Sequence, residues 1–158
     1  MNRDARHIIL ALCALVAVTA CAQRPRLRSA VAVTYDYATE YRQHGVGAKL
    51  RLGLDSHWRL EPEIIYFAES RKVTTLQLNA HIHYVEHLGG PVLLYPFAGV
   101  SYSHWGYEGP NVNRWGANLG AGLELNIGRG WAVVGEFRFM LVKQETQAIT
   151  TVGLSHSF

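Results

Sequence analysis

Nine ionisable side chains are spaced so that one face of a sheet would gather them. They stand at alternate positions in segments whose other residues are mostly apolar, and alternate residues of a strand point to the same side. The set is Asp36, Lys49, Arg51, Arg59, Glu61, Glu63, Glu124, Glu136 and Arg138. Its near balance of sign predicts mutual ion pairing in a confined space, with Arg138 or Lys49 as the partner of Glu124. The alternative is a solvated face of mixed charge.

Serine and histidine are adjacent at two places, which together with His57 are the candidates for nucleophilic catalysis. The pairs are Ser103-His104 and Ser155-His156. A serine nucleophile needs a histidine base within hydrogen-bond reach. Because neighbouring residues of a strand point to opposite faces, neither pair can make this contact within its own strand. We therefore expect no catalytic residues and no enzyme activity.

His81 and His83 are the candidates for a metal site. They are two positions apart, so their imidazoles fall on the same face as the charged residues, and two such groups could hold a metal ion. The spacing offers no obvious third ligand. Polar packing is therefore the expected role of both, with no metal and no cofactor.

The elements that must position these groups are strands. Beyond Leu27 no helical period occurs, and apolar residues alternate with polar ones in about eight segments. They are SAVAVTYDY (29–37), GVGAKLRLGL (45–54), WRLEPEIIY (58–66), TTLQLNAHIHY (74–84), YPFAGVSYS (95–103), ANLGAGLELNI (117–127), WAVVGEFRFML (131–141) and TTVGLSHSF (150–158). Segment 95–103 is the least regular. Pro62 cannot donate to a ladder, so it predicts a bulge.

The connections between these segments alternate in character. Those after the second, fourth and sixth segments are tight: 55–57, 86–91 and 128–130. Those after the odd-numbered segments are more polar and mostly longer, such as 39–45 and 104–114. An even number of antiparallel strands with tight turns at one end and longer loops at the other is typical of an outer-membrane barrel. Closure also removes the free edges of so many strands.

The two faces of the predicted sheet differ in a way that favours a membrane barrel. The apolar face is nearly uncharged over segments long enough for membrane strands, which need about 9–11 residues. The polar face also carries small residues such as Gly120 and Gly122, which leave room in a narrow lumen. Aromatic residues near the segment ends predict two interfacial girdles. These are Trp58, Tyr84, Trp105, Tyr107, Trp115 and Trp131. The alternatives are a soluble lipocalin-like barrel that binds lipid and a small-solute channel, although eight strands leave an interior just filled by side chains.

The first 22 residues predict a cleaved secretory signal peptide. Arg3 and Arg6 precede an apolar run that ends in small residues, and the run is too short to span a bilayer, which takes about 20 residues. Cleavage after Ala22 would remove both cysteines, at positions 13 and 21. A short lipobox-like sequence, 18–21, leaves open that Cys21 is acylated instead. The formal charge falls from +3 to +2 once two Arg and one Asp of residues 1–22 are removed, too little to suggest nucleic acid binding.

Over residues 28–158 the chain resembles the small eight-stranded OmpA/OmpX-like outer-membrane barrels. The matching pieces are Tyr95-Pro96-Phe97-Ala98-Gly99-Val100, Gly120-Ala121-Gly122-Leu123-Glu124 and the terminal Phe158. The resemblance implies an all-β, eight-stranded antiparallel up-and-down transmembrane barrel in the outer membrane of a Gram-negative bacterium.

The resemblance also implies partners and a role. A last strand with alternating apolar residues and a terminal aromatic is the signal that the barrel-assembly machinery reads in that superfamily, which assigns this signal to Val152, Leu154 and Phe158. The expected partners are this machinery and outer-membrane lipid, and the expected state is a monomer. Some small outer-membrane barrels modify lipid A, but the family has no shared catalytic residues. The expected role is structural or one of surface interaction.

Overall fold

The computed structural model describes residues 27–70, 73–107, 112–143 and 145–158, and these form a closed antiparallel barrel of eight strands with one additional short strand. The predicted signal peptide, residues 1–22, lies outside the described residues. The strands are β1 (Ala30–Ala38), β2 (Gln43–Gly53), β3 (Trp58–Ser70), β4 (Val73–Tyr84), β5 (Glu86–Gly89), β6 (Val92–Tyr107), β7 (Val112–Gly128), β8 (Trp131–Val142) and β9 (Glu145–Ser157). In the described ranges there is no helix of the length and apolarity that crossing a membrane requires.

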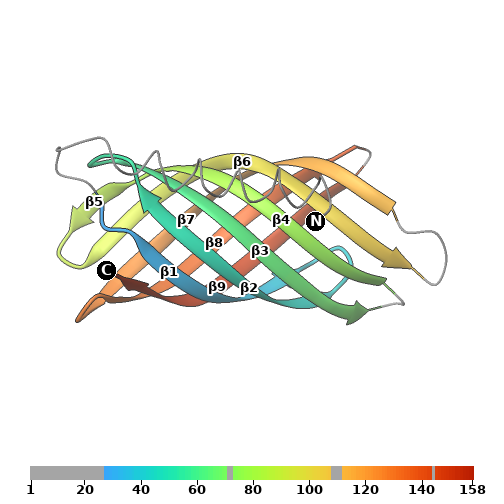
Figure 1. Cartoon of the computed structure of the whole chain (residues 1–158), viewed down its shortest axis with the longest axis horizontal. Coiled ribbons are helices and arrows are strands. Elements are labelled where there is room, and N and C mark those ends of the chain that lie inside the picture. The colour runs from blue at the N-terminus through green and yellow to red at the C-terminus, as the bar shows by residue number, and fades with distance from the viewer. Residues whose placement is uncertain (1–26, 71–72, 108–111, 144) are drawn as a thin grey trace, which may run out of the picture.

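Two pairings close the sheet into a barrel. β1 pairs with β9 from Ala30 opposite Ser157 to Ala38 opposite Ile149, which joins the two ends of the chain. β4 pairs with β6, and β5 stands outside the wall as a short extension that pairs only with the start of β6. Figure 1 shows the strands tilted around the long axis, with β5 and the C-terminus at one end of the barrel. We call this end, which holds the connections after β2, β4 and β7, the turn end, and the opposite end the loop end.

The predicted difference between short turns and long loops is wrong in detail. The strands continue through most of the predicted loops: β2 begins at Gln43, β6 runs to Tyr107 and β7 begins at Val112. Conversely, the segment predicted as a turn at 86–91 contains β5. Strands β6 and β7 have 16 and 17 residues, more than the roughly 9–11 that cross a bilayer. The wall therefore extends beyond the hydrocarbon region.

Pro62 does not form the predicted bulge. It stands opposite Ala80 in an unshifted register between β3 and β4, and the shift in that ladder lies between Phe67 and Ser70. The β2–β3 ladder keeps one register on both sides of Pro62, from Lys49 opposite Glu63 to Leu52 opposite Leu60. No β2 residue pairs with Pro62 or Glu61, so the missing proline donor interrupts the β2–β3 ladder locally without shifting its register.

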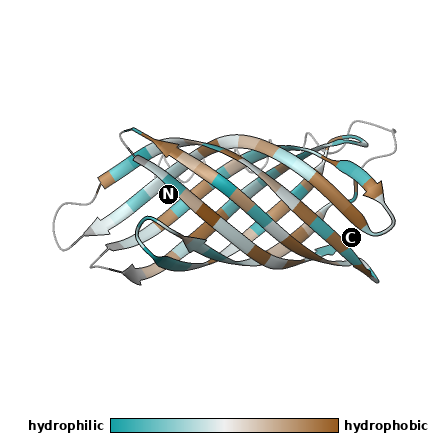
Figure 2. Ribbon diagram, turned by 180° about the vertical axis from the view of Figure 1, so that it is seen from behind, coloured by the Kyte–Doolittle hydropathy of each residue, from teal (hydrophilic) through white to brown (hydrophobic). Residues whose placement is uncertain are grey.

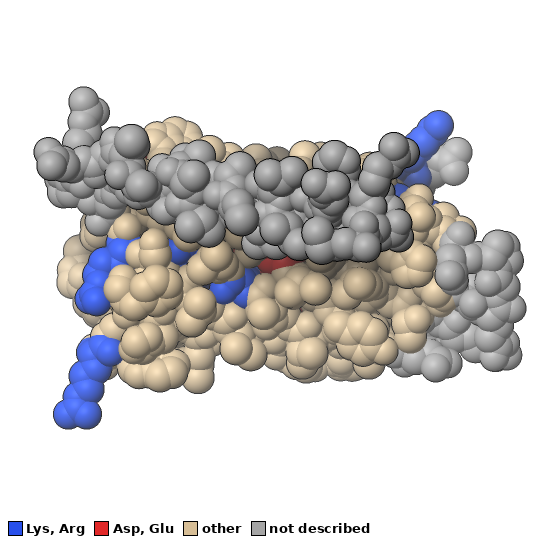
Figure 3. All heavy atoms as spheres, viewed as in Figure 1, with Lys and Arg blue, Asp and Glu red and all other residues tan. Residues whose placement is uncertain are grey.

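The alternation of the sequence becomes an inner and an outer face. Val33, Leu78 and Phe137 are exposed on the outer wall, as are most apolar residues that the sequence assigns to this face. Figure 2 shows hydrophobic and hydrophilic residues alternating along the ribbons. In Figure 3 residues other than Lys, Arg, Asp and Glu make up most of the coloured surface on the visible face, and Lys or Arg side chains project at both ends. An exposed apolar band around a polar interior is the inverse of a soluble protein and fits a wall surrounded by lipid. It contradicts the lipocalin-like alternative, in which the apolar face points inward.

The lumen holds two apolar clusters and a charged layer. Near the turn end one cluster comprises Val85, Leu93, Tyr95, Phe97 and Val134, with Leu27 packed against it. At the loop end a second cluster comprises Ala38, Ile65, Phe67, Met140 and Ile149. Most of the charged residues lie between the clusters and form the charged layer, which meets the first cluster where Glu124 stands opposite Leu93 and Val134. Apolar side chains thus fill part of the described lumen on both sides of Lys49 and Arg51.

Candidate functional site: the charge network of the barrel lumen

Lys49 is the centre of a network of buried ion pairs. Its Nζ lies 3.2 Å from Glu61 Oε1 and 2.9 Å from Glu63 Oε1, and it also contacts Glu136 Oε2. The three carboxylates come from β3 and β8, on either side of the barrel from β2. All four side chains are almost completely buried. Lys49 therefore crosses the lumen and connects its walls.

Arg51, two residues further along β2, makes the second set of pairs. Its Nε donates to Glu61 Oε2 at 2.7 Å and its Nη1 to Glu124 Oε2 at 2.8 Å. Its Nη2 reaches both Glu136 Oε1 and the Tyr95 hydroxyl at 3.2 Å. The hydroxyl of Tyr95 donates in turn to Glu136 Oε1 at 2.8 Å. The guanidinium thereby binds three carboxylates from three different strands.

Arg59 and Arg138 complete the basic set at opposite ends of the charged layer. Arg59 Nη1 donates to Glu124 Oε2 at 3.0 Å, and its guanidinium lies over the Tyr95 ring, 4.6 Å from the centroid. Arg138 Nη1 donates to Glu63 Oε2 at 2.8 Å. Glu124 therefore pairs with Arg51 and Arg59, and the expected pairing with Arg138 or Lys49 is wrong.

The carboxylate of Asp36 is bound by two threonine hydroxyl groups. Its carboxylate accepts hydrogen bonds from Thr34 at 2.8 Å and from Thr151 at 2.5 Å. The whole set of nine groups predicted from the sequence thus lies inside the barrel, with four basic and five acidic members among the described residues. Buried ions need such dense pairing because water no longer solvates them, and loss of one partner typically costs about 3–5 kcal/mol.

The aromatic residues assigned to the two interfaces do not all point outward. Trp58, Tyr84 and Trp131 are exposed at the turn end, and Trp115 is 73% exposed at the loop end. The assignment of Trp105 to the interface is wrong, because its side chain is only 1% exposed and lies inside the loop-end mouth. Its ring is 4.9 Å from the Tyr41 ring, and the Arg114 guanidinium lies over it at 5.1 Å.

The alternation of side chains along β6 explains why Trp105 points inward. Tyr95, Phe97, Ser101 and Ser103 point inward, and an uninterrupted period of two carries Trp105 to the same side. The irregular hydropathy of 95–103 hid this phase in the sequence. Tyr102 is the outward aromatic of this strand and packs against Trp115 at 5.1 Å. The side chain of Tyr107 lies outside the described part of the structure.

The serine and histidine candidates do not form a nucleophile–base pair with an orienting acid. Ser103 and Ser155 point into the lumen, whereas His104 bonds to Asn113 Oδ1 at 2.6 Å and His156 packs on Trp131 at 4.7 Å. The β2–β3 turn contains a Ser–His contact that the sequence did not predict. Ser56 Oγ lies 2.9 Å from His57 Nδ1.

That turn also holds an acid, but its carboxylate serves the backbone. Asp55 Oδ1 accepts the amide hydrogens of His57 at 2.7 Å and Trp58 at 2.8 Å, which is an ordinary way to close a turn. His57 stacks on Tyr84 at 5.6 Å.

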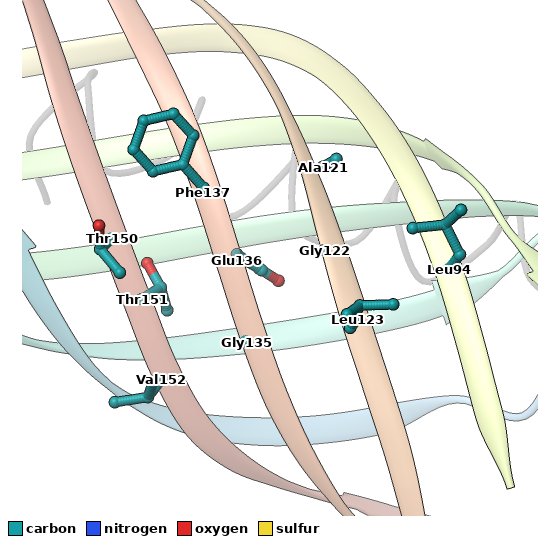
Figure 4. Close-up of a pocket in the computed structure, with 10 residues that line it drawn as sticks. All are labelled: Leu94, Ala121, Gly122, Leu123, Gly135, Glu136, Phe137, Thr150, Thr151 and Val152. Carbon is teal, nitrogen blue, oxygen red and sulfur yellow. The ribbon is translucent and has the colours of Figure 1, made fainter.

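The outer wall has a groove between β6 and β9, where the strands carry glycine and alanine instead of larger residues. Figure 4 shows Ala121, Gly122 and Gly135 at its floor, with Leu94, Phe137 and Val152 around them. The groove encloses about 450 Å³. Glu136 borders it, but its carboxylate bonds to Lys49 and Arg51 in the lumen. Thr150 and Thr151 also line the groove, and the Thr151 hydroxyl donates to Asp36 in the lumen.

The register brings a third potential ligand to the two lumen histidines. Glu61 stands directly opposite His81 on the neighbouring strand, and its Oε1 lies 3.8 Å from His81 Nδ1 and 3.6 Å from His83 Nε2. All three side chains are buried. Spacing along one strand could not reveal Glu61, because only the pairing of β3 with β4 decides which acid faces the imidazoles.

The residues of the expected assembly signal lie at the closing strand. Val152 and Leu154 are exposed on the outer face of β9, and Phe158 is 65% exposed just beyond the strand end. The Phe158 amide donates to the Ser29 carbonyl at 2.9 Å. The last residue is thereby held beside the first strand, at the turn end.

A closed barrel with an apolar exterior, a charged interior and an even number of strands defines an integral outer-membrane protein. The chain belongs to the family described as "Outer membrane protein beta-barrel domain", which matches residues 8–158. Its localisation is the bacterial outer membrane. No curated protein sequence matches the chain.

Solved structures of low sequence identity have the same fold. The N-terminal barrel domain of Pseudomonas aeruginosa OprF is 14% identical, with a TM-score of 0.69 over 84% of this chain and 99% of that one. Neisserial surface protein A (NspA) is 12% identical, with a TM-score of 0.62 over 82% and 96%. The outer membrane enzyme PagL is also 12% identical, with a TM-score of 0.56 over 82% and 99%. Fold similarity of this degree spans enzymes and non-enzymes, so it assigns no chemistry.

Proposed function

We propose that this chain is a structural barrel of the outer membrane that exposes its loop end for surface interactions and neither conducts solutes nor catalyses a reaction. The filled lumen carries the proposal. Lys49 and Arg51 bind carboxylates on several walls, and an apolar cluster lies on each side of them. Ions would have to displace both clusters and break ion pairs that are costly to separate when they are buried.

Planar-bilayer recording of the mature protein tests this proposal. The wild-type barrel should give no steady conductance steps. The variant Phe67→Ala/Leu93→Ala, which thins one apolar cluster at each end, should conduct more than wild type if it still folds to a heat-modifiable barrel. Steady conductance of the wild-type protein would overturn the proposal in favour of the small-solute channel.

The absence of catalysis is part of the proposal and has its own test. The outward-facing His104 bonds to Asn113 and stands opposite it in the β6–β7 ladder, while the serine beside it points inward. We expect purified barrel to release no fatty acid from outer-membrane lipid above a boiled control. Fatty acid release that depends on His104 or His57 would instead show that this barrel is an enzyme.

The loop end is the part of the barrel that can meet external partners. β6 and β7 are the longest strands, and they extend the wall on that side. Trp115 is exposed at the loop end beside Tyr102, and Trp58, Tyr84 and Trp131 are exposed at the other end. We assign these aromatics to the two lipid interfaces. We also propose that the protein is a monomer whose outer wall contacts lipid directly.

Assembly is proposed to depend on the end of β9. Val152 and Leu154 point outward and Phe158 follows them on the same side, so a recognition protein could read all three from the lipid side before β1 pairs with β9. The barrel-assembly machinery is the proposed partner.

A further inference from the structure

Glu61, His81 and His83 form a compact group that the charge network leaves incompletely bonded. His81 Nδ1 and His83 Nε2 are both buried and have no hydrogen-bond partner among the described residues. Both nitrogens point toward Glu61 Oε1, at 3.8 Å and 3.6 Å. These distances exceed an ordinary hydrogen bond. Two buried imidazole nitrogens without a partner among the described residues therefore face one carboxylate oxygen, which Lys49 Nζ also contacts at 3.2 Å.

The separations fit the spacing of ligands around a metal ion. The three ligand atoms all lie within 4.8 Å of one another. In a tetrahedral zinc site, ligands bound at about 2.0–2.2 Å stand roughly 3.3–3.6 Å apart. A small contraction of the group would therefore give bonding distances. Imidazole nitrogen and carboxylate oxygen are also the ligands that Zn²⁺ and its neighbours in the transition series prefer.

The charges around the group permit a cation. Among the nine lumen groups five are acidic and four are basic, so they carry one formal negative charge in excess, which offsets half of the charge of a divalent ion. Lys49 also contacts Glu63 and Glu136, so it keeps two partners when Glu61 Oε1 turns to a metal. Arg51 Nε holds the other oxygen, Oε2, at 2.7 Å. That contact orients the carboxylate as an outer-shell partner commonly does.

We propose that Glu61, His81 and His83 bind one divalent transition-metal ion of the Zn²⁺ type, with solvent as a further ligand. The ion would connect β3 to β4 inside the lumen and stabilise the folded barrel, because the unfolded chain does not preform the site. This site goes beyond the proposed structural role, and the conductance experiment described above does not test it.

Binding requires two neighbours to change their hydrogen bonds. Arg59 Nη2 faces His83 Nδ1 at 3.2 Å, and Asn118 Nδ2 faces His81 Nε2 at 2.8 Å. A ligating imidazole carries its proton on the second nitrogen, which then needs an acceptor. Asn118 can supply Oδ1, which has no described partner, and Arg59 can turn away while Nη1 keeps Glu124. The variant Arg59→Gln, whose amide oxygen can accept this proton, should therefore bind the metal more tightly.

The direct experiment refolds the mature protein in detergent with Co²⁺ or Zn²⁺, removes loose metal with a chelator and counts the bound ions. We expect one ion per barrel and, for Co²⁺, visible absorption typical of tetrahedral coordination. His81→Gln and His83→Gln should each weaken binding at least tenfold. His57→Gln and His87→Gln, which change exposed turn-end histidines, are the matched controls and should bind as wild type does.

The order of addition keeps the test decisive if the lumen variants do not fold. Apolar clusters lie on both sides of the site, so we expect metal present during refolding to be retained and metal added to the folded barrel to enter slowly. No bound metal after refolding with Zn²⁺ would overturn the proposal. So would one ion that exchanges at once with chelator, or one that survives in His81→Gln/His83→Gln.

Discussion

The ring of Tyr95 lies directly over Gly122, its partner in the β6–β7 register. A Cβ atom at Gly122 would come within 2.4 Å of the ring carbons Cε2 and Cζ. The same relationship recurs where Phe97 faces Gly120, with 2.6 Å to the ring. Glycine at these sites lets a large ring lie flat against the opposite strand, so the Tyr95 hydroxyl reaches Glu136 and Arg51.

Gly122→Ala should therefore destabilise the barrel. The new methyl group must displace the Tyr95 ring and disturb its hydrogen bonds, and overpacking of this kind typically costs about 1–3 kcal/mol. Gly135→Ala is the matched control, because it lies nearby on β8 with nothing within 4 Å of the added atom. Urea unfolding of both variants in lipid vesicles measures the difference. Equal stability of the two variants would refute the close packing of Tyr95 on Gly122.

Leu123 and Glu124 test which face of the wall meets lipid. Leu123 is 51% exposed on the outer face, so Leu123→Arg should cost about 2–4 kcal/mol near mid-membrane. Glu124→Gln should also destabilise, because Arg51 and Arg59 lose a shared carboxylate. In a barrel with a wet polar face, Glu124→Gln would change the free energy of unfolding by less than about 0.5 kcal/mol. Urea unfolding in lipid distinguishes the two cases.

Charge reversal tests the network that the structure defines. Arg138 binds Glu63, whereas Glu124 binds Arg51 and Arg59. The double variant Glu63→Arg/Arg138→Glu should recover part of the stability that each single reversal loses. Glu124→Arg/Arg138→Glu should show no such recovery. A double-mutant cycle of unfolding free energies measures both coupling energies, and coupling only in the second pair would contradict the assigned partners.

Deletion of Phe158 should reduce assembly more than stability. The Phe158 ring is exposed, and even complete burial of such a side chain is worth only about 1.5–3 kcal/mol. Less barrel should reach the outer membrane, and more degraded or periplasmic chain should appear, while the barrel that does assemble should unfold at nearly the same urea concentration. Membrane fractionation and unfolding curves provide the two measurements. Normal assembly would mean that the terminal aromatic carries no signal.

The barrel should be heat-modifiable on gels. Each barrel strand is paired on both sides, so detergent meets no free edge at which to open the sheet. Unheated protein should migrate differently from boiled protein. Identical migration, together with solubility without detergent, would contradict a membrane barrel.

The sequence alone determined the strands and their two faces, because a period of two is a local property that each segment carries independently. It therefore assigned Lys49, Glu61 and Arg138 to one face, where the structure buries all three side chains, and it missed the phase of Trp105 where the hydropathy of β6 is irregular. Only the tertiary structure decided which groups meet. Register between strands is set by closure of the whole barrel, and it gives Glu124 to Arg51 and Arg59, sets Tyr95 over Gly122 and turns Glu61 toward His81 and His83. No spacing along a single strand contains that information.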